Sequence, residues 1–596
     1  MNRTRGIAAM VAALSIVAVF ALAACGGSSG TTTQDFPLPT EAPSDAQKGG
    51  TLEVIASSDV DYLDPGAAYY QFTFMVDYAM VRPLLSWPPG ETKTPQPDLA
   101  ADQPKISDDG KTVTFKIRQG VEFAPPVSRQ VTSADVKYAI ERGLMPGVAN
   151  GYIGAYMDGL EGFDEANKAV EGNPTVAPDI SGIQTPDDQT IVFQLSDTSS
   201  ATLIQALSLP LSAPVPEEYA KEFDAQSPSA YGDQVIATGP YMIENDSKGA
   251  LTGYEPGKEI RLVRNPNWDP STDDRPAFVD AITVKEGYAD TASASRQILT
   301  GEAQVNGDFG PPPSVLREAA TKYKEQLSLP ASGGSRYVSL NTQLAPLDDL
   351  NVRKAILAAT NREALRLTSG GEAAGAIANH FIPPEIPGFE EAGGFDGTGV
   401  DFLENPSGDL DLAAKYMKKA GYASGKYDGN DELLMVGDDS SSGRKVGEIL
   451  LDTLQKLGFK VNYRPVSQEI MYTKFCGTPA AKVAICTTTG WLKDFNDAES
   501  LLDPTFNGNN ILPSNNVNWP QLDVQSINDA MAKAALLTDQ GERTQAWADI
   551  DKQITAQAPA IPWIWDNSPV IWSENVAPVV NLFNATADLS YTSLKK

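Results

Sequence analysis

The chain has 596 residues, well above the length of about 150 that is typical of one domain, and 41% of them are hydrophobic, enough for one or two large cores. Its 46 Lys and Arg residues stand against 77 Asp and Glu residues, which gives a net charge of −31. Such a surface repels phosphate backbones, so nucleic acid is not expected as a partner, and acidic composition most often reflects solubility.

The first 24 residues have the pattern of a signal peptide. Arg3 and Arg5 precede an apolar stretch over residues 7–22, and small residues lead to Cys25. Small residues directly before a cysteine resemble the lipobox of bacterial lipoproteins, in which that cysteine is lipidated and becomes the N-terminus. The alternative is an uncleaved membrane helix, since the apolar run is nearly long enough to span a bilayer. We expect cleavage, a lipid anchor on Cys25 and a location outside the cytoplasm at the cell membrane.

Residues 25–47 contain mainly Gly, Ser, Thr, Pro and Ala, which predicts a flexible tether between the anchor and a folded body. Beyond it, alternating apolar residues predict half-buried strands over 112–117 and 190–195. A helix is expected between them, over residues 133–140.

The second half of the chain is richer in predicted helices. Asn351 and Asp411 are candidates to cap two of them, and a third, over residues 446–457, stops at Gly458. A strand over residues 459–463 follows directly. The succession of helix, glycine and strand is typical of an α/β layer fold.

Two further cysteines, Cys476 and Cys486, lie ten positions apart. In an exported protein such a pair is expected to form a disulfide rather than a metal site. A metal would need further soft or imidazole ligands, and the one histidine, His380, is about a hundred residues away in a proline-rich loop. We expect His380 to be structural, and no metal or other cofactor.

Hydrolase chemistry finds little support. The Gly-x-Ser-x-Gly match at residues 26–30 lies in the tether, without the strand and helix that a nucleophile elbow needs. A single histidine argues against a Ser or Cys triad. A glycosidase that uses two carboxylates stays open as an alternative, because it needs only two Asp or Glu residues at a fixed separation and the chain has 77. No catalytic residue is predicted.

Several short segments, in order along the chain, resemble the family 5 extracellular solute-binding proteins of ABC importers. They are Tyr62–Pro65, Ser107–Phe123, Thr132–Lys137, Ala237–Tyr241, Arg264–Trp268, Gly301–Ala303, Ser339–Asn341, Asp411–Tyr422, Gly490–Phe495 and Ala558–Pro562. The chain departs from the family pattern at Ala124–Pro126 and at Gln304. The segments span almost the whole mature chain.

The resemblance implies a two-lobed α/β fold of the periplasmic-binding-protein type, with discontinuous lobes, an extra subdomain and a ligand held between lobes that close. It places the first lobe at residues 48–90, 237–334 and 556–596. The extra subdomain would cover 91–236 and the second lobe 335–555.

Within that fold, Gly490–Phe495 resembles a Gly-Trp-x-x-Asp-Tyr segment whose aspartate pairs with a peptide's α-ammonium group. The resemblance therefore implies that Asp494 binds the ligand's amine, although an Asp here could also cap the following helix. Trp491 is equally compatible with a pocket wall and a buried core position. Phe495 stands where the family has Tyr, and Asn341 and Tyr70 lie in segments near the inter-lobe region. Asp497 is expected to be a helix cap and Lys493 to be solvated.

Together these features predict a monomeric substrate-binding lipoprotein, not an enzyme. It would capture oligopeptides and deliver them to the permease subunits of an ABC importer. The family also has members for nickel, haem, glutathione and sugars, so another small solute is the alternative. A secreted hydrolase that uses carboxylates is the rival from another class.

Overall fold

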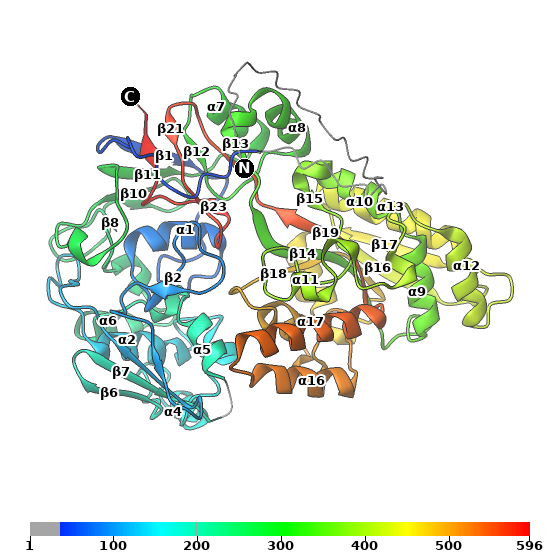
Figure 1. Ribbon diagram of the computed structural model, residues 1–596, viewed down its shortest axis with the longest axis horizontal. Coiled ribbons are helices and arrows are strands. Elements are labelled where there is room, and N and C mark those ends of the chain that lie inside the picture. The colour runs from blue at the N-terminus through cyan, green and yellow to red at the C-terminus, as the bar shows by residue number, and fades with distance from the viewer. Residues whose placement is uncertain (1–35, 197–198, 596) are drawn as a thin grey trace, which may run out of the picture. The chain divides into compact units, whose positions relative to one another are not determined.

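The computed structural model describes residues 36–196 and 199–595. The predicted signal peptide and Cys25 lie outside the described residues. Within the described part, no helix has the length and apolar character needed to cross a bilayer. Three sheets of four or more strands organise this part of the chain (Figure 1).

The first sheet has the order β12-β1-β11-β10-β8, with β9 beside β10. Its strands are β1 (Thr51–Ile55), β8 (Tyr241–Ile243), β9 (Tyr254–Glu255), β10 (Glu259–Arg264), β11 (Ala281–Lys285) and β12 (Val305–Asn306). β1 runs parallel to β11 and β12. Val54 packs into the core that contains helix α1 (Gln71–Met80), whereas Ile55 packs on α7 (Thr291–Leu299) and α8 (Pro313–Lys322). Both faces of this sheet are therefore covered.

A smaller antiparallel sheet lies inside the range predicted for the extra subdomain. Its order is β4-β5-β7-β6, with β4 at Lys105–Ile106, β5 at Thr112–Lys116, β6 at Ile183–Asp187 and β7 at Thr190–Gln194. The two strands predicted from alternation are thereby confirmed as β5 and β7, paired with each other. The helix expected between them is α2 (Ser133–Glu141).

The second large sheet has the order β15-β19-β14-β18-β16-β17. Its strands are β14 (Ala331–Leu340), β15 (Gly375–Ala376), β16 (Glu432–Asp438), β17 (Lys460–Val466), β18 (Ile485–Leu492) and β19 (Ala560–Asn567). β16 is parallel to β17 and β18. Val338 on β14 faces α9 (Leu350–Ala359), α12 (Leu410–Lys419) and α13 (Ser441–Lys456). Tyr337 faces the opposite layer, which is made of α11 (Phe389–Ala392), α15 (Glu499–Phe506), α16 (Gln525–Ala535) and α17 (Gln540–Ala556). Figure 1 shows these two helical layers on either side of the sheet.

The helices of the second half form where the sequence predicts them, but two caps shift. α9 begins at Leu350 because Asp349 Oδ1 accepts the N–H of Asn351, so Asn351 is not the cap. Likewise Asp409, not Asp411, caps α12 through the N–H of Leu412. The predicted helix before Gly458 is α13. The remaining helix bounds are α3 Ile153–Tyr156, α4 Phe163–Gly172, α5 Ser200–Ala206, α6 Glu217–Asp224, α9 Leu350–Ala359, α10 Arg362–Ser369, α11 Phe389–Ala392, α12 Leu410–Lys419, α13 Ser441–Lys456, α14 Gln468–Ile470, α15 Glu499–Phe506, α16 Gln525–Ala535 and α17 Gln540–Ala556.

Short two-stranded pairs complete the described part of the chain. They are β2 (Leu85–Ser86) with β3 (Gln96–Pro97), β13 (Leu327–Ser328) with β20 (Val570–Ile571), β21 (Val576–Ala577) with β24 (Ser593–Leu594), and β22 (Val580–Asn581) with β23 (Thr586–Ala587). The chain leaves the first lobe next to β13 and returns next to β20, and these two strands pair antiparallel.

The fold is thus a two-lobed α/β architecture in which the second lobe is inserted into the first. Every strand of the second large sheet falls between residues 331 and 567. Because β19 belongs to that sheet, we propose that the return to the first lobe occurs near residue 567 rather than at 556. The other expected boundaries stay predictions.

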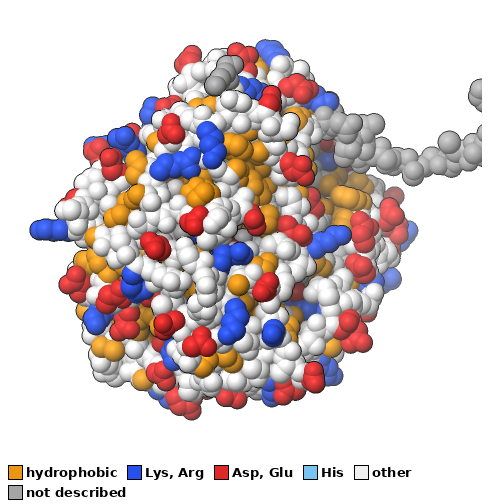
Figure 2. All heavy atoms as spheres, turned by 60° about the vertical axis from the view of Figure 1, so that its left-hand side comes forward, with side chains coloured by type: hydrophobic (Ala, Val, Ile, Leu, Met, Phe, Trp, Pro, Cys, Tyr) orange, Lys and Arg blue, Asp and Glu red, His pale blue; other side chains and the backbone are white. Residues whose placement is uncertain are grey.

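Charge is dispersed over the surface. Figure 2 shows acidic and basic side chains scattered over one face, without a continuous field of basic side chains on that face. The net charge of −31 is therefore not balanced there by a broad basic patch.

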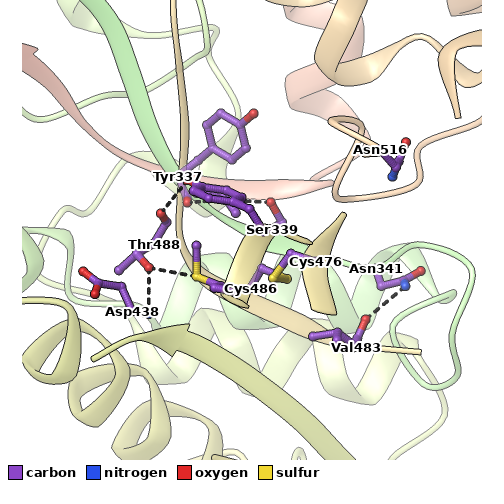
Figure 3. Close-up of a disulfide and its surroundings, with 12 residues drawn as sticks. Tyr337, Ser339, Asn341, Asp438, Cys476, Val483, Cys486, Thr488 and Asn516 are labelled. Carbon is purple, nitrogen blue, oxygen red and sulfur yellow. Dashed lines mark hydrogen bonds between the residues drawn. A yellow bond between two sulfur atoms is a disulfide. The ribbon is translucent and has the colours of Figure 1, made fainter. Parts of the chain in front are cut away.

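The predicted disulfide between Cys476 and Cys486 is confirmed. Cys476 ends a helical turn over Met471–Cys476, and Cys486 lies on β18 (Figure 3). The hydroxyl of Thr488 donates to the sulfur of Met471 at 3.3 Å. The bridge therefore fastens this turn to the strand that leads to Gly490–Phe495.

Candidate functional site

The candidate site follows the carboxyl end of β18. Because β18 and β16 are parallel, this edge is where α/β proteins commonly bind ligands. Gly490 pairs with Arg336 on β14, and a Cβ at Gly490 would lie 2.9 Å from the carbonyl oxygen of Ser335. The glycine of the Gly490-Trp491 pair is thus required by the close approach of β14.

Asp494 occupies a half-buried position beyond the end of β18. Its Oδ2 accepts a hydrogen bond from the hydroxyl of Tyr156, which belongs to α3. No Lys or Arg nitrogen of the described residues lies within 4.0 Å of its carboxylate. Burial raises the pKa of Asp494 to about 7, and the Tyr156 hydrogen bond opposes part of that rise. Asp494 is therefore a desolvated carboxylate without a cationic partner.

Aromatic rings line one side of this carboxylate. Tyr69 stacks on Tyr152 with ring centroids 4.9 Å apart, and Tyr152 stacks on Tyr156 at 6.2 Å. The row ends with Phe495, whose ring meets the Tyr156 ring edge-on with the ring centroids 4.8 Å apart. Burial, followed by the charge of Asp494, raises the pKa of all three tyrosines, so their hydroxyls remain protonated donors.

Phe495 is fully buried in the core that contains the first sheet, although it belongs to the second lobe. Its ring is covered by Tyr156 and neighbouring apolar side chains. It therefore serves as an apolar anchor between the lobes, and its expected direct contact with ligand stays a prediction.

Trp491 and Tyr70 differ in their availability. Trp491 is half-buried and its ring N–H donates to the carbonyl oxygen of Ser500 at 2.9 Å, so only part of the ring is free to form a wall. Tyr70 is 63% exposed at the start of α1, where its backbone N–H donates to Asp61. Both residues remain compatible with a contact to ligand.

Asn341 is not brought to this site. It follows β14 at the end opposite to Trp491, at least five residues along the strand, or roughly 16 Å at the usual rise. Its side chain donates to the carbonyl oxygen of Val483 (Figure 3). The same side chain accepts the N–H of Gln343. The buried amide thus fixes a turn near the disulfide, and the ligand contact expected for Asn341 stays a prediction.

Lys493 and Asp497 lie close to Asp494 in the sequence, and only Asp497 has the surroundings expected of it. Lys493 was expected to be solvated, but only 8% of it is exposed, and its ammonium lies 4.9 Å from the centre of the Phe583 ring. Burial lowers the pKa of Lys493 to about 8, opposed by the charge of Glu385. Asp497 does accept the N–H of Glu499 at the start of α15, as a cap would, and also pairs with Arg543 at 2.6 Å.

The segment from Lys493 to Glu499 therefore connects the second lobe to the rest of the chain. Besides the contacts of Lys493, Asp494 and Phe495, the amide of Asn496 donates to the carbonyl oxygen of Thr92 at 2.8 Å. The hydroxyl of Thr202 on α5 donates to Glu499 at 2.7 Å. We call residues 493–499 the inter-lobe segment.

No group of three or more His, Cys, Asp or Glu in the described residues has an arrangement that could hold a metal ion. His380 is fully buried, with Nδ1 2.8 Å from Asp551 and Nε2 3.1 Å from the carbonyl oxygen of Gly394. Both ring nitrogens are engaged within the protein, in agreement with the structural role expected for His380.

Tyr152 and Tyr156 were missed by the sequence analysis. They lie four residues apart, which is the spacing that places two side chains on one face of a helix. That spacing alone does not reveal Asp494 as their neighbour, because it lies 338 residues after Tyr156.

Comparisons with known proteins agree with this architecture. The family model described as bacterial extracellular solute-binding proteins, family 5 Middle, matches residues 94–512, more than half of the chain. The chain belongs to this family. Its members are binding proteins of ABC transporters, so this family 5 protein binds a solute outside the cytoplasm and is not an enzyme.

Similar proteins include a di/tripeptide-binding protein of Pseudomonas aeruginosa, 24% identical over 77% of this chain and 78% of the relative. A glutathione-binding protein of Escherichia coli is 25% identical over 80% of this chain and 82% of the relative. Among solved structures, clavulanic acid biosynthesis oligopeptide binding protein 2 has a TM-score of 0.80 at 24% identity, covering 94% of this chain and 99% of its own. The structural similarity establishes the two-lobed fold of this family 5 protein.

Proposed function

We propose that this family 5 protein is the substrate-binding lipoprotein of an ABC importer for short peptides. It captures a peptide between its lobes, pairs the free amino end with Asp494, and delivers the peptide to permease subunits in the membrane. The monomeric chain is held at the membrane by a lipid on Cys25.

The observation that carries this proposal is the state of Asp494. A desolvated carboxylate is normally paired with a cation or protonated. Here the described residues offer it one neutral hydroxyl and no ammonium or guanidinium group. A peptide's α-ammonium is a cation present whatever the side chains, and it would form a charge-assisted hydrogen bond with this carboxylate.

The remaining residues divide into contacts and framework. We assign Tyr70 and the exposed part of Trp491 to the wall around the ligand, since aromatic rings supply rigid apolar area. Phe495 and Asn341 belong to the framework, because one is fully buried and the amide of the other is used by the backbone. The names of the di/tripeptide- and oligopeptide-binding relatives support peptides as the ligand class.

Glutathione is the second candidate, because a relative is named for it and because it too carries an α-ammonium group. A sugar, a metal complex or haem lacks that group and would not need an unpaired Asp494. Amine-dependent binding therefore separates peptides and glutathione from the other solutes.

Isothermal titration of the detergent-solubilised full chain tests the proposal with trialanine, N-acetyl-trialanine and glutathione. We expect trialanine to bind, and Asp494→Asn to weaken it about 100-fold, since breaking a buried charged pair is worth about 2–5 kcal/mol. Asp529→Asn, on the exposed face of α16, is the matched control and should bind as the wild type does. Equal binding of free and acetylated trialanine would show that Asp494 does not read an amine.

A further inference from the structure

We propose that Tyr156 is a positioning residue for amine recognition: its hydroxyl, supplied by α3, holds the Asp494 carboxylate in one orientation and in its charged form. This inference rests on the proposed function, in which Asp494 receives the ligand's ammonium group. It adds a second residue to the site, from a part of the chain that the sequence did not connect with ligand binding.

The ring of Tyr156 is held on both sides. Tyr152 stacks against it at 6.2 Å with an angle of 21° between ring planes, and Phe495 meets it at 4.8 Å and 64°. Only 6% of Tyr156 is exposed. A ring packed in this way cannot turn its hydroxyl to other partners without losing both contacts. The position of the hydroxyl is therefore fixed by the fold.

The hydrogen bonds of Asp494 show what this hydroxyl does. Its Oδ2 accepts from Tyr156, and the described residues provide no donor to its Oδ1. A carboxylate has about four lone-pair directions. One is occupied by Tyr156, which sets the plane of the carboxylate, and the remaining directions stay available to an ammonium group.

The charge of Asp494 depends on the same contact. Burial raises its pKa to about 7, and the hydrogen bond from Tyr156 is the contribution that lowers it. The other titratable groups facing it are Tyr69 and Tyr152, whose pKa values are raised by burial and by Asp494, so they stay neutral. Among the described residues, no Lys or Arg nitrogen lies within 4.0 Å of the Asp494 carboxylate, so no cation lowers its pKa as well. Without the hydroxyl, Asp494 would be protonated at a higher pH than it is now.

The two partners come from different parts of the fold. Tyr156 lies in the predicted subdomain, and Asp494 lies in the second lobe, so their contact exists only when these parts meet. Bringing them together removes water from the carboxylate, which is unfavourable unless a cation replaces that water. The Tyr156–Asp494 contact thus makes closure selective for ligands that bring a positive group.

The experiment compares wild type, Tyr156→Phe and Tyr152→Phe. The first substitution removes only the hydroxyl that reaches Asp494 and keeps the ring. The second is the matched control, because the Tyr152 hydroxyl faces the carbonyl oxygen of Tyr69 at 3.4 Å. Trialanine affinity is measured by titration calorimetry from pH 5.5 to 8.5 with the full chain in detergent.

For Tyr156→Phe we expect about 10-fold weaker binding at pH 7, the effect of losing one hydrogen bond to a charged group. The midpoint of the rise of affinity with pH should move up by about one unit. Tyr152→Phe should keep the wild-type midpoint. An equal loss at every pH, or no loss, would overturn the proposal, because a merely structural role does not move a midpoint.

A second measurement does not depend on the ligand. The midpoint of the ligand-free protein's stability change with pH is compared between wild type and Tyr156→Phe, each with and without Asp494→Asn. We expect Tyr156→Phe to move the midpoint only where Asp494 is present. If trialanine fails to bind but this shift occurs, the peptide proposal fails and the Tyr156–Asp494 coupling stands. If the shift is absent, the coupling is wrong.

Discussion

At the scale of single residues, Asp494 differs from the buried carboxylates that pair with arginine. Arg142 is fully buried, and it donates to both oxygens of Asp64 at 2.7 and 2.8 Å and to Asp224. Arg543 likewise pairs with Asp497 and Glu499. These ions are neutralised within the fold, as burial requires. Asp494 has no such partner among the described residues, and a carboxyl group with a raised pKa beside the inter-lobe segment is a candidate ligand contact.

Glu286 is a second carboxyl group in an unusual state, and its effect should be on stability. It is 8% exposed at the carboxyl end of β11, and neither of its carboxyl oxygens has a hydrogen-bond partner among the described residues. Burial first, then the nearby carboxyl group of Asp59, raises the pKa of Glu286 to about 8. The folded state thus binds a proton that the unfolded state releases near pH 4.5, so stability falls as the pH rises from about 4.5 to 8.

Glu286→Gln should remove this dependence while keeping the size and shape of the side chain. We expect its free energy of unfolding to match wild type at pH 5 and to exceed it by on the order of 4 kcal/mol at pH 8.5. Urea unfolding at the two pH values measures the difference. A variant less stable than wild type at pH 8.5 would contradict the raised pKa of Glu286.

Lys493 and Phe495 show why the residues of the site were only partly predictable. The local sequence of the inter-lobe segment does not predict which partners bury these two residues. Those partners, Phe583 for Lys493 and Tyr156 for Phe495, lie 90 and 339 residues away. Asp494 could be singled out because the resemblance supplied its role. Its partner Tyr156 could not, since a tyrosine on a short helix is an ordinary core residue until the lobes are assembled.

At the scale of elements, local patterns predicted more. The strands over residues 112–117 and 190–195 were predictable because alternation with period two is imposed by burial of one face. The helix caps moved by two residues, from Asn351 to Asp349 and from Asp411 to Asp409, because each helix offers more than one capping side chain nearby. Which sheet a strand joins, as for β19, depends on pairing that no local pattern contains.

The disulfide is the element that orients the approach to the site. It closes a short loop of ten residues between the turn at Met471–Cys476 and β18. Replacing both cysteines by serine should lower the free energy of unfolding by about 2–3 kcal/mol, from the loop-closure entropy returned to the unfolded chain. Urea denaturation of oxidised wild type and the double serine variant measures the change.

Wild type under reducing conditions is the control for that experiment and should match the double serine variant. The free energy of trialanine binding should change less than the free energy of unfolding in the double serine variant. Asp494 is held by Tyr156 and the inter-lobe contacts as well as by β18. If the double serine variant were as stable as wild type, the disulfide would not stabilise the protein by lowering the conformational entropy of the unfolded chain.

At the scale of the whole molecule, the second lobe meets the remainder of the chain through the inter-lobe segment. Five of its seven residues contact the other part of the fold: Lys493, Asp494, Phe495, Asn496 and Glu499. The residue that would bind the ligand thus belongs to the segment that closes the protein. Ligand affinity and the equilibrium between open and closed forms should therefore change together.

Thr202→Val tests this coupling at a contact remote from the amine. The Thr202 hydroxyl donates to Glu499 at 2.7 Å, and burial raises the pKa of Glu499 to about 7 despite the nearby Arg543. Valine keeps the shape and removes the donor, so the closed form loses about 1 kcal/mol while the open form is unaffected. Since the binding-competent form becomes rarer, we expect the Kd for trialanine to rise by about three- to fivefold.

Calorimetry gives the Kd, and small-angle X-ray scattering should show a larger radius of gyration for ligand-free Thr202→Val that returns to the wild-type value when peptide is saturating. Thr300→Val is the matched control, because the Thr300 hydroxyl is exposed and bonds only to backbone of its own helix α7. If Thr202→Val bound trialanine with wild-type affinity, the contacts of the inter-lobe segment would not contribute to ligand binding. In that case closure would be driven by the peptide alone, and the contacts of Glu499 would serve stability only.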